Sequence, residues 1–253
     1  MKVVSIVLLF LMVYSCAPED RPDCFQSSGT RERRLISVLP FSRIRVEEGI
    51  ELVVKQGDQL KVESEGGKNL LNEVTAIVEE GRLILRNDNS CQWIRGNNDP
   101  IRITIQTPVL TEIRTATQYA IRSEGILSFP SLALISEDFT ENTDITVGIF
   151  DLDVATEKLT VVSNNISSFF IRGTAQSLDV NFASGMGRFE GGELRANTIS
   201  VFHRGANDII VCPDGLLTAQ LRSTGDLIAV CPPVSQNIQT FYKGRFIPLY
   251  QNE

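Results

Sequence analysis

Three basic side chains recur at one position of a repeated segment in the second half of the chain. They are Arg204, Arg222 and Lys243, and each lies five residues after the apolar residue that begins an alternating stretch. If the repeats stack as parallel strands, these side chains form an outward ladder with steps of about 5 Å. Charge-assisted hydrogen bonds favour repeated anions, so the ladder predicts binding of sulfated or carboxylated glycans. An ordinary solvated surface is the alternative.

The only histidine, His203, is the obvious candidate for a catalytic base. It lies four residues after Ile199, on the same alternating face as Val201, so we expect it to point into the core. Its counterparts in neighbouring repeats are large apolar residues, namely Phe182, Leu221 and Tyr242. An imidazole in an apolar stack gives no support to a Ser–His–Asp site, and we assign no catalytic residue.

Two aspartates, Asp208 and Asp226, each lie nine residues after the start of a repeat and directly before an apolar pair. This position favours turn residues that bind nearby backbone amides. A glycosidase would need two carboxylates about 5 to 9.5 Å apart in distinct environments. Stacked aspartates could meet that distance, so this pair is kept as the weaker, enzymatic hypothesis.

An acidic segment, EDFTENTD, contains Glu137, Asp138, Glu141 and Asp144. Calcium takes six to eight oxygen ligands, and this segment could offer several of them. It lacks the glycine of an EF-hand loop and the tandem repeat of calcium-binding β-rolls, so we expect a hydrated loop. No cysteine pair has zinc-ligand spacing and there is one histidine, so we predict no metal site and no cofactor.

The repeat that positions these residues is clearest near the C-terminus. With an offset of 18 residues, segment 199–211 (ISVFHRGANDIIV) aligns with segment 217–229 (LTAQLRSTGDLIA). From position 159 onward, the starts of the stretches are 19, 21, 18 and 21 residues apart. Similar stretches begin at five other positions, namely Ile101, Leu132, Leu159, Leu178 and Ile238.

A repeat of about 20 residues built from short strands and polar turns indicates a solenoid. Leucine-rich repeats share this period, but their L-x-x-L-x-L pattern is missing. We therefore predict an all-β fold, a single-stranded parallel β-helix (β-solenoid), right-handed by the general preference of parallel crossovers. The segment from about 41 to 85 differs, with a hairpin turn expected at 79–82. It should act as an N-terminal β-hairpin cap.

The N-terminus predicts export. Lys2 precedes a nearly unbroken apolar run over 3–14, which is too short to span a bilayer and is typical of a signal peptide. The run ends in Val-Tyr-Ser-Cys, similar to the lipobox of bacterial lipoproteins, so we expect a signal peptide over 1–15 and lipid attachment at Cys16. Residues 16–35 are expected to form a tether, and 36–253 a single β-solenoid domain.

Four further cysteines suit an oxidising compartment. Cys212 and Cys231 are 19 residues apart, which is one turn of the solenoid, so stacking brings them within disulfide distance. Cys24 and Cys91 flank the N-terminal cap, and we expect them to pair with each other. Three pairings of four cysteines are possible, and this is the favoured one.

Composition excludes one class of partner. The chain of 253 residues has 24 Lys plus Arg against 31 Asp plus Glu, a net charge of −7. Nucleic-acid binding needs a basic surface, so no nucleic-acid partner is expected.

Six segments resemble the putative auto-transporter adhesin head GIN domain family of Bacteroidetes envelope lipoproteins. They are DCFQSSG (23–29), PFSRIRV (40–46), VKQGD (54–58), GKNLL (67–71), LILRN (83–87) and CQWIR (91–95). The resemblance covers most of the chain after the tether. It implies a β-solenoid fold and a location in the cell envelope, and it supplies no catalytic residues.

Together these observations predict a non-catalytic lipoprotein of the outer membrane, periplasmic-facing or at the cell surface, anchored to the membrane by lipid. It would present a rigid face to glycans or to envelope or host proteins, because prearranged side chains lose little entropy on binding. The alternative is a β-helix polysaccharide lyase or glycosidase, which would need a cleft with a charged constellation. A third hypothesis is a structural subunit of the envelope.

Overall fold

The chain is all-β in the computed structural model, which describes residues 27–89, 100–140 and 145–250. These residues form seventeen strands and one short 3₁₀ helix, η3 (Leu71–Glu73), with no α-helix among them. The all-β prediction is confirmed. No helix in the described part is long and apolar enough to cross a membrane. The predicted signal peptide, Cys16, Cys24 and Cys91 lie outside the described residues.

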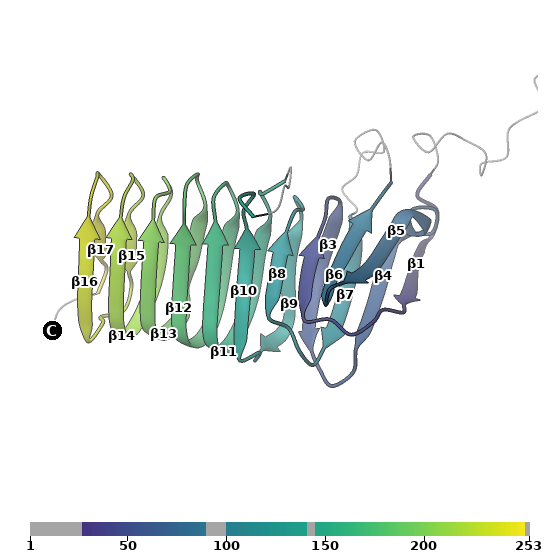
Figure 1. Cartoon of the computed structure of the whole chain (residues 1–253), viewed down its shortest axis with the longest axis horizontal. Coiled ribbons are helices and arrows are strands. Elements are labelled where there is room, and N and C mark those ends of the chain that lie inside the picture. The colour runs from purple at the N-terminus through teal and green to yellow at the C-terminus, as the bar shows by residue number, and fades with distance from the viewer. Residues whose placement is uncertain (1–26, 90–99, 141–144, 251–253) are drawn as a thin grey trace, which may run out of the picture.

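The second half of the chain is a row of long strands that pair in parallel. Each pairs with the next over most of its length, as Figure 1 shows. Leu159, Leu178, Ile199 and Leu217 stand at matching positions, which confirms the predicted register for these repeats. The strands are β11 (Ile149–Ser163), β12 (Ser168–Phe182), β13 (Arg188–His203) and β14 (Ile209–Leu221).

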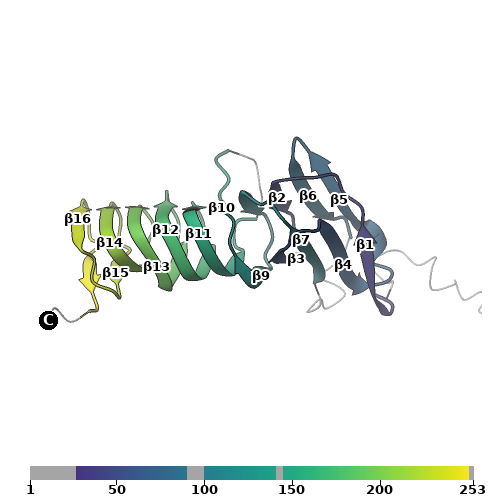
Figure 2. The same ribbon diagram turned by 90° about the horizontal axis from the view of Figure 1, so that it is seen from below.

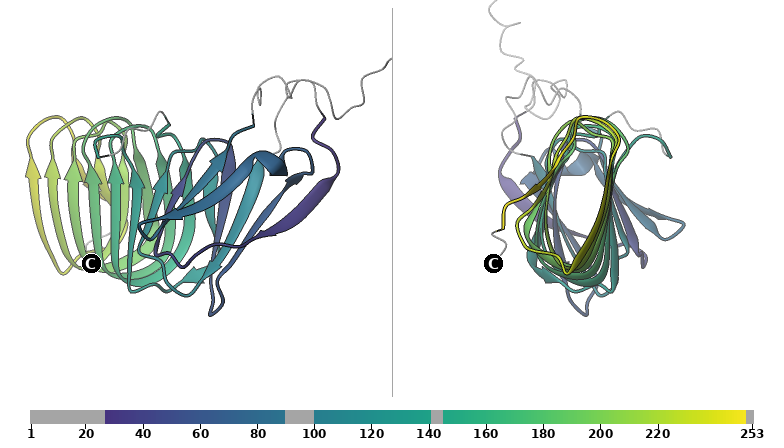
Figure 3. Two further views of the ribbon diagram at one scale, coloured as in Figure 1. Left: turned by 45° about the vertical axis from the view of Figure 1, so that its right-hand side comes forward. Right: turned by 90° about the vertical axis from the view of Figure 1, so that its left-hand side faces the viewer.

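Each long strand bends, so that its first and second halves belong to two different parallel ladders. Viewed along the long axis, successive strands follow one elongated closed outline (Figure 3). The bend in β12 falls at Gly173, where φ is +109° and a Cβ would collide with the carbonyl oxygen of Val154. Only glycine adopts such a backbone conformation without strain.

The final strands are β15 (Leu227–Ala229), β16 (Ser235–Thr240) and β17 (Phe246–Pro248). Leu217 pairs with Gln236, so Ile238 stands two residues later in the repeat than predicted. A shift by two keeps the same residues facing inward, which is why alternation alone missed it. Tyr242, expected to point inward beside Leu221, is wrong for the same reason and is 60% exposed.

Aromatic rings fill the interior of this row. Phe150 and Phe169 stand at paired positions of β11 and β12, and their rings stack at 4.9 Å with planes 7° apart. Phe182, at the other end of β12, lies 5.8 Å from Phe169. All three side chains are fully buried. Parallel pairing in register therefore turns the sequence repeat into a continuous apolar stack.

The same two ladders extend through the first half of the chain. β8 lies between β2 and β10, and β9 lies between β3 and β11. Ile101 pairs with Ile50 rather than preceding Leu132 in a ladder, so its predicted place as the previous repeat is wrong. The strands are β2 (Arg43–Val46), β3 (Ile50–Gln56), β6 (Arg82–Asn87), β7 (Ile101–Thr107), β8 (Glu112–Thr115), β9 (Ala120–Leu127) and β10 (Ser131–Ser136).

Antiparallel strands close the N-terminal end. They are β1 (Arg31–Ile36), which falls largely within the expected tether, β4 (Lys61–Gly67) and β5 (Val74–Glu79). β4 pairs with β1 and β7, and β5 with β6. The predicted hairpin turn is confirmed, with Glu80 and Gly81 at φ +49° and +75°. Figure 2 shows this group at one end of the molecule and β15 and β16 at the other.

The predicted disulfide between Cys212 and Cys231 is confirmed, with a Cα–Cα distance of 4.7 Å. It joins β14 to the segment that follows β15. The bridge ties the last strands to the row before them.

Candidate ligand-binding face

The structure brings two of the three predicted basic residues together. The pairing of β13 with β14 puts Arg204 and Arg222 at matching positions, each directly after its strand. The pairing of β14 with β16 puts Phe241 at the next matching position. Lys243 lies two residues further along, so its predicted place in the ladder is wrong, again because the last repeat is shifted.

All three basic side chains are exposed, and within the described part of the chain none forms an ion pair with a carboxylate. Most other basic side chains do. Arg195, for example, pairs with Asp214, and Lys158 pairs with Asp179. Uncompensated cations are therefore concentrated on the last strands of a chain that is acidic overall.

Aromatic rings hold the guanidinium of Arg222. Its Cζ lies 4.1 Å from the centre of the Phe241 ring and 5.7 Å from that of Phe202. Its Nε donates a hydrogen bond of 3.1 Å to the Oε1 of Gln220. Stacking of a planar guanidinium on rings fixes its direction, so Arg222 presents its remaining N–H donors to solvent in a defined orientation.

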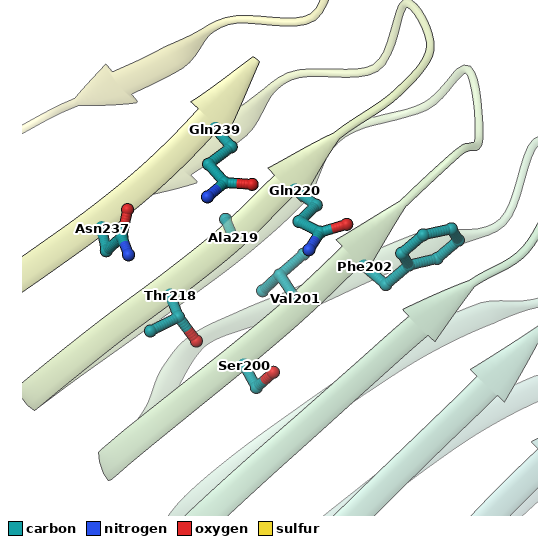
Figure 4. A pocket seen from close by; sticks show the side chains of 8 residues that line it. All are labelled: Ser200, Val201, Phe202, Thr218, Ala219, Gln220, Asn237 and Gln239. Carbon is teal, nitrogen blue, oxygen red and sulfur yellow. The ribbon is translucent and has the colours of Figure 1, made fainter. Parts of the chain in front are cut away.

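Beside these residues, a groove of about 190 Å³ crosses the outer side of β13, β14 and β16. Figure 4 shows its outward side chains on three adjacent strands. They form two rows across the strands, with Ser200, Thr218 and Asn237 in one and Phe202, Gln220 and Gln239 in the other. None of the lining side chains is charged. We call these six residues together with Arg204 and Arg222 the polar face.

The first carboxylate in these rows lies one strand away. Asp179 on β12 pairs in register with Ser200, and its Oδ2 lies 3.3 Å from the Nζ of Lys158. The negative charge at this border is therefore balanced, and the polar face keeps a positive end at Arg204 and Arg222. Parallel pairing holds every side chain of the face on a strand or at its end, so the arrangement exists before any ligand binds.

The interpretation of His203 as a core residue is confirmed. It is 1% exposed and packs edge-on against Phe182, with ring centres 6.1 Å apart. Nδ1 accepts a hydrogen bond of 3.3 Å from the N–H of Gly205, and Nε2 lies 2.7 Å from the carbonyl oxygen of Asn207. Because the carbonyl needs a donor, these partners fit a neutral imidazole protonated at Nε2.

Burial lowers the pKa of His203 below its ordinary value, against the opposing effects of the Asn207 carbonyl and of Asp208. The unfolded chain therefore takes up a proton more readily, and stability should fall as pH drops below about 6.5. We expect the melting temperature of wild type to fall more than that of His203→Leu between about pH 7.5 and pH 5.5. Parallel pH profiles for the two proteins would contradict this account.

Asp208 and Asp226 are turn residues, as predicted. The Oδ1 of Asp208 accepts the N–H of Asp226 at 3.2 Å, and the Oδ1 of Asp226 accepts the N–H of Arg245 at 2.8 Å. The side-chain hydrogen bond from Arg245 lowers the pKa of Asp226. A glycosidase needs a carboxylic acid of raised pKa, so this environment does not suit the acid of such a pair.

Glu137 does not lie in a hydrated loop, and that expectation is wrong for it. It is 3% exposed and forms an ion pair of 2.7 Å with Arg114, which is 5% exposed. The N–H of Thr140 donates to the same carboxylate. Glu141 and Asp144 lie outside the described residues. Elsewhere in the chain as described, no cluster of three or more His, Cys, Asp or Glu could hold a metal ion.

A second groove, of about 290 Å³, lies beside the N-terminal hairpin. Its basic side chains are engaged locally. Arg43 donates to the carbonyl oxygen of Glu80, and Arg82 lies 3.4 Å from the carboxylate of Glu112. This groove therefore offers less unpaired charge than the polar face.

Sequence reasoning missed the uncharged rows of the polar face and the ring contacts of Arg222. Part of the signal was present, because the 18-residue offset that aligns Arg204 with Arg222 also aligns Phe202 with Gln220. The third member, Gln239, follows at 19 residues and became visible only with the corrected register.

Comparison with solved structures shows the same fold in other bacterial proteins. A protein described as a putative adhesin from Bacteroides fragilis matches with a TM-score of 0.75 at 22% identity, over 87% of this chain and 97% of that chain. A putative adhesin from Parabacteroides merdae matches with a TM-score of 0.57 at 14% identity, over 88% and 98%. A putative lipid binding protein from Parabacteroides distasonis also has a TM-score of 0.57, at 13% identity over the same shares.

No curated protein matches the chain. The family model described as putative auto-transporter adhesin, head GIN domain, matches residues 40–233. This match confirms the resemblance seen in the sequence segments. The chain therefore belongs to the putative auto-transporter adhesin, head GIN domain family.

Proposed function

We propose that this protein is a non-catalytic, exported lipoprotein whose polar face binds acidic glycans. In this proposal the two parallel ladders form a right-handed β-helix over residues 36–253. Residues 16–35 tether it to lipid on Cys16 in the outer membrane, and Cys24 pairs with Cys91. Membership of an adhesin-like family supports an exported, adhesive role.

The observation that carries the proposal is the polar face itself. It combines two unpaired guanidinium groups with rows of hydroxyl and carboxamide side chains on adjacent strands. Hydroxyl-rich ligands need both donors and acceptors at fixed positions, and Ser, Thr, Asn and Gln supply both. The guanidinium groups suit the carboxylate or sulfate of an acidic sugar. Strand spacing of about 4.8 Å repeats these groups along an extended chain.

Protein partners are the alternative occupants of this face. Two features favour a glycan. The groove lacks large apolar pockets of the kind that protein hot spots fill, and its ligand groups repeat from strand to strand. A polysaccharide repeats its polar groups in the same way.

The test is a retention experiment with the full chain and a panel of carboxylated, sulfated and neutral polysaccharides, with and without calcium. Both retention and the size of the recovered polysaccharide are measured. We expect wild type to retain intact acidic polysaccharides, and Arg204→Ala/Arg222→Ala to weaken binding at least about tenfold.

The matched control is Arg188→Ala/Arg195→Ala, which removes two charges from the other ladder of β13. It should bind like wild type. Failure of all polysaccharides to bind, or equal binding by the two double variants, would contradict the proposed site. Shortened polysaccharide would contradict the non-catalytic role.

A further inference from the structure

The last strands of the row present an open edge. β16 pairs along one side with β14, and β17 pairs along one side with β15. In the described part of the chain, no other strand register is formed on their outer sides (Figure 1). An open strand edge leaves N–H and C=O groups available to another strand. Pro248 removes one donor from β17, so β16 is the better edge for pairing.

This edge lacks the charges that usually protect such strands. No charged residue occurs from position 231 to position 242. Several apolar side chains near it are largely exposed, namely Val234 at 87%, Phe241 at 54%, Tyr242 at 60% and Leu249 at 64%. At the opposite end of the molecule, four of the six residues of β1 are charged. The two ends therefore differ in chemistry, and head-to-tail stacking would join unlike surfaces.

We propose that β16 pairs antiparallel with β16 of a second copy of this chain, forming a twofold dimer. This proposal does not depend on the proposed glycan binding. A neutral edge can face its own copy without like-charge repulsion, and identical surfaces meeting about a twofold axis form a closed dimer. An antiparallel partner strand fulfils the open hydrogen bonds directly.

One register makes the edge complementary to itself. Ile238 lies on the inner side of β16, opposite Ala219, and pairing Ile238 with its copy joins the two interiors. Asn237 then faces Gln239 of the copy on the outer side. Extending the register past the strand ends sets exposed Val234 against exposed Tyr242, which gives each an apolar partner. The polar face would then continue from one copy to the other.

The test is sedimentation of the full chain over a range of concentrations. Val234→Asp and Tyr242→Lys, each alone, should weaken the dimer at least about tenfold. The combination Val234→Asp/Tyr242→Lys should recover dimerisation, because the register places the new Asp opposite the new Lys. Val109→Asp, at a residue 54% exposed in the segment between β7 and β8, is the control and should leave the dimer unchanged.

Both altered side chains are exposed, so the fold should persist, and a melting curve of each variant checks this. A wild-type chain that stays monomeric at every concentration would overturn the proposal. So would single variants that dimerise as wild type does. A double variant no better than the single ones would overturn the register, and with it the proposed pairing. Binding of an unrelated extended peptide to monomeric wild type would assign the edge to a different partner.

Discussion

Phe169→Ala should lower the free energy of unfolding by about 3–5 kcal/mol, the range for a large aromatic removed from a packed core. The ring is fully buried and stacks on Phe150 at 4.9 Å, and it also lies near Phe182. Strands that pair in register cannot shift independently to fill the gap, so most of the cavity should remain. Urea-induced unfolding followed by circular dichroism measures the effect.

The neighbouring residue is the matched control. Phe170 points outward from the same strand and is 38% exposed, so Phe170→Ala removes the same atoms from the surface. We expect a much smaller loss of stability. Equal losses for the two variants would mean that the aromatic stack is not a main source of stability.

Arg114→Met should lower the free energy of unfolding by about 3–5 kcal/mol, because it leaves the buried carboxylate of Glu137 without its cation. Burial alone would raise the pKa of Glu137, but hydrogen bonds from Thr140, Arg114 and the backbone outweigh it, so the pKa is lowered. The carboxylate is therefore charged in the folded protein at neutral pH. Thermal and urea unfolding of the variant measure the loss.

Arg114→Met/Glu137→Gln should be more stable than Arg114→Met, since the uncompensated charge is gone. Arg195→Met breaks an exposed ion pair and should change stability little. If Arg114→Met were as mild as Arg195→Met, the buried pair would have no structural importance.

The repeats of the second half were predictable because alternation and offset agree there. Leu159, Leu178, Ile199 and Leu217 all stand where the sequence placed them. The inward position of His203 followed from the same pattern. The hairpin at Glu80 and Gly81 followed from local turn chemistry.

Other features depend on distances along the chain that alternation cannot fix. The last repeat is shifted by two residues, which keeps the inward face but moves Lys243 out of line with Arg222. The pairing of Ile101 with Ile50 joins segments far apart in sequence. The partner of Glu137 is Arg114 on a neighbouring strand, and no local pattern links the two.

The polar face was only partly predictable, for a physical reason. Its charged end came from residues that repeat in type, Arg204 and Arg222. Its uncharged rows differ in type from strand to strand, as Phe202 and Gln220 do. Such rows become a site only when register brings them together.

The most direct test of the central claim, that the polar face binds the ligand, compares two phenylalanines on opposite ladders. Phe202 lines the groove and lies beside Arg222, whereas Phe170 points outward from the other ladder. Calorimetric titration with an acidic polysaccharide that wild type retains should show Phe202→Ala weakened about fivefold or more. Phe170→Ala should bind as wild type does. Equal affinity for the two variants, or a loss confined to Phe170→Ala, would contradict the account.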